Sequence, residues 1–161
     1  MTTPASHTAH ARRAAFRRPY RIRFSDCDPA GIVFYPQYFV MLNGHVEEWF
    51  ADGLGIPYRS LILDRRIGLP SVRIEVDFTA VSRMGEEVEL ALTVERLGRA
   101  SITLAHAITG GGEPRMAMRQ VIVATSLHTH RAIAVPDDVR SALVERGYAP
   151  ETPLGTAAAA A

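Results

Sequence analysis

The sequence predicts a single α+β domain in which an antiparallel sheet of about five strands wraps around one long buried helix. Two observations support this fold class. Apolar residues recur in steps of three and four over residues 37–52, which is the spacing of one helix face. Over four later stretches they alternate with polar residues, as in strands joined by hairpins. An apolar helix of this kind must be covered by one face of the sheet.

The composition is that of one ordinary globular domain. The chain has 161 residues, of which 47% are hydrophobic and 22% are charged, and this length suits one domain. No run of 18 apolar residues could cross a membrane, and the N-terminus lacks the apolar core of a secretory signal. The single cysteine, Cys27, excludes an internal disulfide and a cysteine-ligated zinc site within one chain. We therefore expect a cytoplasmic protein.

Basic charge is concentrated at the N-terminus. Residues 1–18 carry four arginines and no acid, so the rest of the chain is slightly acidic and unlike a nucleic-acid-binding protein. We predict that residues 1–18 form a flexible basic tail, with a cleavable organelle-targeting peptide as the alternative. Residues 151–161, which are rich in alanine, are predicted to be a second flexible tail, and residues 19–150 the folded domain.

The first predicted elements are a short strand and the long helix. Residues 20–24 alternate apolar and charged side chains, which predicts a half-buried strand. The helix over 37–52 has Pro36 at its start, where proline is favoured, and glycines at its end. Gly44 lies inside the helix, where glycine costs about 1 kcal/mol relative to alanine. A close crossing of another backbone segment would explain this glycine.

The second half of the chain is predicted to be mostly strand, after an irregular or partly helical stretch. Glycine-rich turns at 98–99 and 110–112 separate the last three strands. The predicted strands are 71–80, 86–97, 101–109 and 116–127. Residues 137–146 predict a short closing helix. Strands joined successively by hairpins would form an antiparallel sheet, and its unpaired edges favour dimerisation.

The segment between the first strand and the helix carries the candidate chemistry. It reads Asp-Cys-Asp-Pro-Ala-Gly-Ile-Val-Phe-Tyr-Pro over residues 26–36 and places two carboxylates and a glycine turn before the helix. A helix N-terminus presents unpaired N–H groups and the positive end of the helix dipole. A thioester carbonyl would be polarised there, and a nearby carboxylate could attack it or activate water.

This segment resembles the signature of the hotdog-fold acyl-CoA thioesterases, specifically the 4-hydroxybenzoyl-CoA thioesterase type. The pattern Asp-x-Asp-x-x-Gly-x-Val-x-x-x-x-Tyr is matched by Asp26, Asp28, Gly31, Val33 and Tyr38. The aromatic-acyl branch is the closer match, because a sister branch usually carries histidine where this chain has Tyr35. The resemblance covers about residues 19–136, including the order of the strands.

The resemblance implies roles for individual residues. Asp28 matches the catalytic carboxylate, acting as a nucleophile that forms an acyl-aspartyl anhydride or as a general base for water. The backbone N–H of Tyr35 would polarise the thioester carbonyl, and Gly31 would shape the turn for close approach of the substrate. The residues expected at the acyl pocket are Tyr58, Leu69, Pro70 and Ser71. Those expected at the coenzyme A phosphates are Arg99 and Ser101, with Arg96 nearby but without a fuller basic cluster.

The implied activity is hydrolysis of an acyl-CoA thioester to a free carboxylate and coenzyme A. This chemistry needs no metal or redox cofactor, and we expect a homodimer or homotetramer. From the charge and hydropathy of the chain, no nucleic-acid or membrane partner is expected. An aromatic acyl group such as 4-hydroxybenzoyl is the first expectation. The alternatives are a short or medium aliphatic acyl group, and an acyl-CoA-binding protein of the same fold without turnover. A dehydratase of this fold is disfavoured, because no histidine or glutamate lies at the start of the helix.

Some of these residues also have a structural interpretation. Asp28 precedes a proline and could be a turn residue, and Asp26 is expected to order the loop by accepting hydrogen bonds from backbone N–H groups. Cys27 is expected to be a small buried side chain rather than a nucleophile. His45 is expected to be a hydrogen-bonded histidine of the core. The histidines expected at a solvated strand end are His128 and His130.

Overall fold

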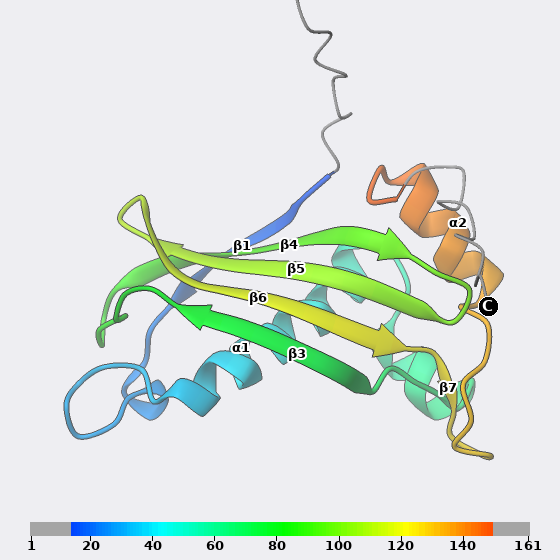
Figure 1. The fold of residues 1–161 in the computed structure, drawn as a ribbon, viewed down its shortest axis with the longest axis horizontal. Coiled ribbons are helices and arrows are strands. Elements are labelled where there is room, and N and C mark those ends of the chain that lie inside the picture. The colour runs from blue at the N-terminus through cyan, green and yellow to red at the C-terminus, as the bar shows by residue number, and fades with distance from the viewer. Residues whose placement is uncertain (1–13, 150–161) are drawn as a thin grey trace, which may run out of the picture.

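The computed structural model describes residues 14–149 and contains one antiparallel sheet over one long helix (Figure 1). The strand order is β1-β4-β5-β6-β3, and every neighbouring pair is antiparallel. The five strands are β1 (Phe16–Arg21), β3 (Ser71–Phe78), β4 (Glu87–Leu97), β5 (Ser101–Gly110) and β6 (Glu113–Val123). The predicted α+β architecture is therefore confirmed.

Strand β1 begins earlier in the chain than predicted. Phe16 is buried and its ring stacks on His45, while Arg17 and Arg18 form ion pairs with Glu89 and Asp52. The boundary of the predicted tail at residue 18 is therefore wrong, because the alternation of buried and exposed residues already starts at Phe16. The rest of that tail, residues 1–13, and the predicted tail 151–161 lie outside the described residues.

The chain turns soon after β1 instead of continuing as a strand to residue 24. Residues Phe24–Asp26 form a short 3-10 helix, η1, and the side chain of Phe24 is exposed. The turn follows from Asp26, whose carboxylate accepts a hydrogen bond from the N–H of Arg23 at 2.7 Å. This local bond competes with extension of the strand.

Helix α1 (Tyr35–Glu48) starts two residues before the predicted helix and continues into a π-helical turn, η2 (Trp49–Gly53). Its buried side chains include Tyr38, Leu42 and Val46, which face the sheet. The predicted backbone crossing at Gly44 is wrong for the described residues, since no atom outside the adjoining helix backbone lies within 4 Å of the position that a Cβ would occupy.

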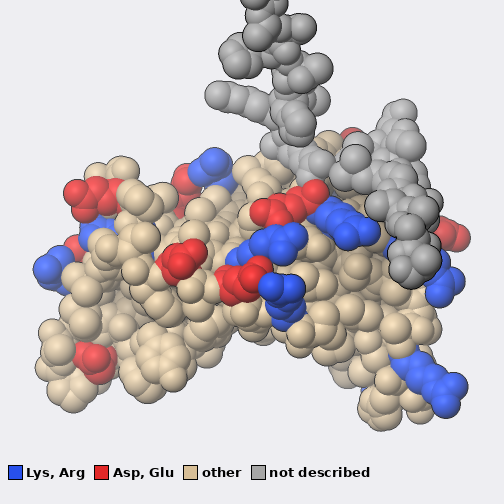
Figure 2. Space-filling model, viewed as in Figure 1, with Lys and Arg blue, Asp and Glu red and all other residues tan. Residues whose placement is uncertain are grey.

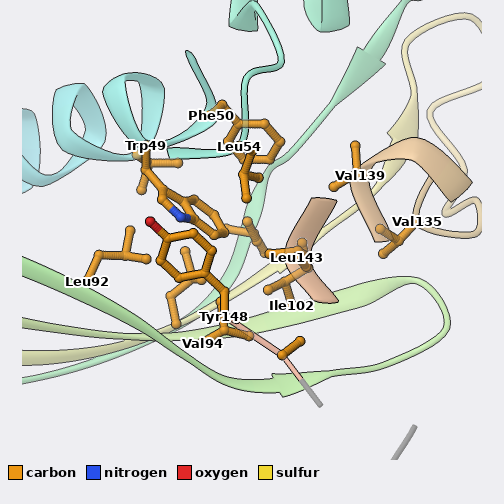
Figure 3. Packing of buried hydrophobic residues seen from close by; sticks show 14 of the residues in the cluster. Trp49, Phe50, Leu54, Leu92, Val94, Ile102, Val135, Val139, Leu143 and Tyr148 are labelled. Carbon is orange, nitrogen blue, oxygen red and sulfur yellow. The ribbon is translucent and has the colours of Figure 1, made fainter. Parts of the chain in front are cut away.

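The core is divided between the two ends of α1. The cluster at its start contains Tyr38, Leu42 and Ile108 among other residues. The cluster at its end surrounds Trp49, where helix α2 (Asp137–Glu145) adds Val139 and Leu143 (Figure 3). Burying a large apolar side chain stabilises the fold by about 1.5–3 kcal/mol, so α2 contributes to holding this end closed.

The order of the strands differs from the predicted run of successive hairpins. Strand β3 pairs with β6 at the far edge of the sheet, not with β4, its successor in the chain. The intervening stretch 56–68, predicted as irregular or partly helical, contains a π-helical turn η3 (Ser60–Asp64) and leads into β2 (Ile67–Gly68). Strand β2 pairs with β7 (Thr125–Ser126) in a separate two-stranded sheet.

The outer face of the five-stranded sheet carries interspersed acidic and basic side chains (Figure 2). On this sheet Arg119 of β6 pairs with Glu75 at 3.5 Å and with Glu95 at 2.6 Å. Almost all residues of the edge strand β3 are exposed, and Ile74 among them is 45% exposed. None of the helices within residues 14–149 is long and apolar enough to span a bilayer.

Candidate active site

Residues 26–34 form a closed loop between η1 and α1. The carbonyl of Asp26 accepts a hydrogen bond from the N–H of Phe34 at 2.9 Å, and the N–H of Asp28 donates to the carbonyl of Ile32 at 3.0 Å. Gly31 at the tip has a φ of +74°, which a residue with a side chain rarely adopts. The loop therefore carries Asp28 on one arm and leads through the other arm directly into the helix.

The Asp28 carboxylate is partly committed to this loop. Its Oδ1 accepts a hydrogen bond from the N–H of Ala30 at 2.8 Å, which confirms the structural interpretation of Asp28 as a turn residue. The side chain is half-buried. One oxygen is thus oriented by the backbone while Oδ2 remains available for chemistry.

The start of α1 presents an unused donor close to this loop. Tyr35 is the first helical residue, Pro36 has no N–H, and the N–H of Gln37 donates to the carbonyl of Phe34 at 2.8 Å. No residue of the described part of the chain accepts a hydrogen bond from the N–H of Tyr35, and no side chain caps the helix. This N–H group, together with the helix dipole, can polarise a carbonyl oxygen.

Asp26 orders the loop, as predicted. It is 6% exposed, and its Oδ2 accepts hydrogen bonds from the N–H of Arg23 at 2.7 Å and from the hydroxyl of Tyr20 at 3.1 Å. Burial and the Asp26 carboxylate raise the pKa of Tyr20, which keeps the phenol protonated as a donor. The contribution of Tyr20 was not predicted, because the sequence pattern indicated only an apolar position in a strand.

A hollow of about 310 Å³ lies beside the loop and the start of α1. Its wall contains the rings of Tyr35, Tyr38 and Phe78, and the ring centroid of Phe78 lies 6.5 Å from that of Tyr35 and 5.7 Å from that of Tyr38. The other lining residues are Ile32, Val33, Thr79, Ala80 and Val81. The alternating pattern placed Phe78 on an apolar strand face, but it gave no signal that the end of this strand meets the start of the helix.

The residues predicted for the acyl pocket lie elsewhere. Leu69, Pro70 and Ser71 precede or begin β3, and the carbonyl of Pro70 accepts a hydrogen bond from the N–H of Val123. Tyr58 packs on Phe50 at 5.4 Å between ring centroids, within the cluster around the end of α1.

The predicted coenzyme A residues lie at that same end of the sheet. Ser101 begins β5 opposite Val123, and Arg99 is exposed in the hairpin between β4 and β5. Phe78, beside the hollow, pairs with Met116 of β6. Val123 lies seven positions after Met116 in β6, which corresponds to roughly 23 Å of strand. The start of α1 and the hairpin between β4 and β5 lie at opposite ends of the sheet (Figure 1). One chain therefore does not bring these residues and Asp28 to a single site.

Comparison with protein families identifies the chain. The model of the thioesterase-like superfamily matches residues 22–143, which include the loop, α1 and all but one of the strands of the sheet. The chain belongs to this superfamily. Two sequence relatives of this thioesterase-like protein have reported activities. The 4-hydroxybenzoyl-CoA thioesterase of Pseudomonas sp. strain CBS-3 is 30% identical over 73% of this chain and 89% of the relative.

The second relative is the 1,4-dihydroxy-2-naphthoyl-CoA hydrolase of Synechococcus elongatus, which is 31% identical over 78% of this chain and 86% of its own length. The crystal structure of the Pseudomonas enzyme superposes with a TM-score of 0.72 at 28% identity, covering 81% of this chain and 99% of that structure. The structure of a gentisyl-coenzyme A thioesterase superposes with a TM-score of 0.71 at 27% identity, covering 80% of this chain and 100% of that structure. The predicted hotdog fold of the thioesterase-like protein is thus confirmed.

Cys27 does not have the surroundings of a nucleophile. It is half-buried rather than fully buried as predicted, and its Sγ lies 3.4 Å from the carbonyl oxygen of Arg23. Burial, followed by the carboxylates of Asp26 and Asp28, raises the pKa of the thiol and disfavours the reactive thiolate.

Three histidines within residues 14–149 had predicted roles, one in the core and two at a strand end. His45 is buried as predicted, but neither of its ring nitrogens has a hydrogen-bond partner within residues 14–149, so the predicted hydrogen bond is wrong. The two histidines confirmed as exposed are His128 and His130. In the described part of the chain, no group of three or more His, Cys, Asp or Glu side chains could hold a metal ion.

Proposed function

We propose that this thioesterase-like protein hydrolyses an aromatic acyl-CoA to a carboxylate and coenzyme A, with Asp28 as the catalytic carboxylate. Membership of the superfamily and the two CoA thioester hydrolases among its relatives support the class of reaction. The observation that carries the aromatic acyl group is the hollow beside the Asp28 loop, with Tyr35, Tyr38 and Phe78 in its wall. Its volume of about 310 Å³ is at the small end of ligand sites, which span ~300–1,000 Å³.

In the proposed mechanism, the thioester carbonyl oxygen accepts a hydrogen bond from the N–H of Tyr35. Oδ2 of Asp28 attacks the carbonyl carbon, the C–S bond breaks, and coenzyme A leaves as a thiolate. Water then hydrolyses the resulting anhydride and restores the carboxylate. In the alternative, Asp28 removes a proton from water, and the hydroxide attacks the same carbon. Neither route requires a metal or a redox cofactor.

We also propose that the protein is a homo-oligomer, either a dimer or a tetramer. The exposed edge strand β3, with apolar side chains such as Ile74, supports this assembly. The placement of the predicted acyl-pocket and coenzyme A residues supports it as well. If Ser71 or Arg99 contacts the substrate at Asp28, a second copy of the chain must supply it, since the two groups lie at opposite ends of one chain.

A panel of aromatic and aliphatic acyl-CoA thioesters, assayed by released thiol, tests the proposal together with Asp28→Asn. We expect benzoyl-type thioesters to be preferred. The substitution should lower kcat by at least ~100-fold, because it removes the nucleophile or base, while substrate binding is retained. Asp64→Asn is the matched control. Asp64 is an exposed carboxylate at the end of η3, and its Oδ1 lies 3.9 Å from Nη1 of Arg59.

Each contrary outcome has a defined meaning. Near-normal turnover by Asp28→Asn would refute the catalytic role of Asp28. Preference for aliphatic chains would refute the aromatic substrate but keep the reaction. Binding of acyl-CoA without turnover of any thioester would favour the non-catalytic binding protein.

A further inference from the structure

Tyr20 joins the edge of the sheet to the loop that carries Asp28. It belongs to β1, which pairs only with β4, and its half-buried side chain faces the core on the α1 side. Its hydroxyl donates a hydrogen bond to Oδ2 of Asp26 at 3.1 Å. The same oxygen accepts the N–H of Arg23 at 2.7 Å, so the buried carboxylate is held from two directions.

Asp26 in turn controls both reacting groups of the proposed site. It lies two residues before Asp28, and its carbonyl accepts the N–H of Phe34, the residue directly before Tyr35. A displacement of Asp26 would therefore change the separation between the Asp28 carboxylate and the Tyr35 N–H group.

The first arm of the loop, residues 26–30, and the second arm, residues 31–34, are attached to the rest of the fold in different ways. The second arm is fixed by backbone hydrogen bonds, from the N–H of Val33 to the carbonyl of Ser82 at 2.9 Å and from the N–H of Met84 to the carbonyl of Gly31 at 3.1 Å. The first arm, which carries Asp28, is joined to the second arm by the backbone hydrogen bonds of Asp26 and Asp28, and it is bonded to the sheet through the side chain of Asp26. The Tyr20 hydroxyl is the donor to that side chain from the sheet.

We propose that Tyr20 is a positioning residue, whose hydroxyl fixes Asp26 and thereby sets the distance of Asp28 from the carbonyl-binding N–H of Tyr35. This inference rests on the proposed function of Asp28. The hydroxyl does not touch the substrate; it acts through the carboxylate of Asp26 and the backbone of the loop.

Tyr20→Phe removes only the hydroxyl and tests this role. We expect kcat to fall roughly tenfold with KM changed less than about twofold, because small misplacements of a reacting group can cost up to ~100-fold in rate. Tyr20→Phe combined with Asp26→Ala, which removes the acceptor, should be no slower than Asp26→Ala alone, since both changes break the same interaction. Unchanged kcat in Tyr20→Phe, or multiplicative effects in the double variant, would overturn the proposal.

The thiol of Cys27 provides a second measurement that needs no substrate. This is the only cysteine of the chain and it lies between Asp26 and Asp28. Its reaction rate with a maleimide should rise at least about threefold in Tyr20→Phe if the first arm loosens, and an unchanged rate would contradict the inference. This readout distinguishes failure of the positioning role from failure of the proposed thioesterase activity.

Tyr148→Phe is the matched control. Tyr148 is a buried phenol, whereas Tyr20 is half-buried, and the Tyr148 ring packs against Trp49 at 5.7 Å between centroids, in the cluster at the end of α1. We expect this variant to keep the wild-type kcat and the wild-type rate of Cys27 modification. Equal changes in both variants would show that Tyr20 has only a general stabilising role.

Discussion

Asp28 and Tyr35 contribute different parts of their residues to the proposed site. Asp28 supplies a side-chain oxygen that the N–H of Ala30 helps to orient. Tyr35 supplies its backbone N–H, which is available because the first turn of α1 has no acceptor for it. The ring of Tyr35 has a separate role in the wall of the hollow, next to Phe78. Substitutions of Tyr35 would therefore report on the acyl group and not on carbonyl polarisation.

Phe78→Ala should reduce the preference for aromatic acyl groups. The substitution removes one of the aromatic rings in the wall of the hollow, so we expect kcat/KM for benzoyl-CoA to fall about tenfold, or ~1.4 kcal/mol, with a smaller effect on hexanoyl-CoA. Steady-state kinetics with both thioesters measures the difference. Leu63→Ala, an exposed position in η3, is the control. Equal losses for the two substrates would contradict the assignment of the hollow to the acyl group.

At the scale of elements, α1 and the sheet each bury a histidine side chain. His45 comes from α1 and His106 from β5, where its Nε2 lies 2.9 Å from Oε1 of Gln120. Burial lowers the pKa of His45 to about 4, with further lowering by His106 and Arg18. Burial also lowers the pKa of His106 to about 4, against the raising effect of Gln120. Both histidines are therefore neutral in the folded protein at pH 7.

Acid should weaken the packing of α1 on the sheet. In the unfolded chain these histidines take up protons below pH 6.5, whereas in the folded protein they resist until about pH 4. The free energy of unfolding therefore has its full value above pH 6.5. Between pH 6.5 and pH 4 it falls by about 1.4 kcal/mol per pH unit for each histidine.

Urea unfolding between pH 4.5 and pH 7.5 measures this dependence. The variant His45→Phe, which removes one titrating ring of similar size, should show a shallower slope of unfolding free energy against pH. His128→Asn, at an exposed position, should keep the wild-type slope. A His45→Phe slope equal to that of the wild type would refute the contribution of the buried histidine.

At the scale of the whole molecule, the described sheet ends in two edge strands, β1 and β3, and β3 is the one with a row of exposed apolar side chains. Strand β3 pairs with β6 on one side and has no partner strand on the other within the described residues. Its exposed apolar side chains are Val72, Ile74 and Phe78. An exposed apolar edge invites pairing with another chain. In contrast, the opposite edge strand β1 carries Arg17 and Arg21 in ion pairs with β4.

Ile74→Arg should dissociate the proposed homo-oligomer. A charge in the middle of the open edge would be buried without a partner in a sheet-to-sheet interface. We expect the molar mass from light scattering to fall to that of one chain, while Leu63→Arg, also at an exposed apolar position, keeps the mass of the wild type. A wild-type protein that is already monomeric would contradict the proposed assembly.

The local elements of this protein follow from its sequence. Alternation located β4 and β5 to within one residue at each end, and spacing located α1, because each pattern reflects which side chains face the core. The pattern of Asp26, Asp28 and Gly31 before a proline-started helix indicated the loop of the proposed active site. These signals lie within about ten residues of one another, so neighbouring side chains and backbone bonds decide the structure.

Only the tertiary structure decided which distant elements meet. It placed β3 beside β6 and brought Phe78 to the start of α1, whereas Ser71 and Arg99 lie at the opposite end of the sheet. It also buried His45 without a hydrogen-bond partner within the described residues. A periodic pattern shows which face of a strand is apolar, but it does not show which strand will pair with it or which part of the helix will cover that face. That choice depends on the packing of the whole sheet around the helix, which no local stretch of sequence contains.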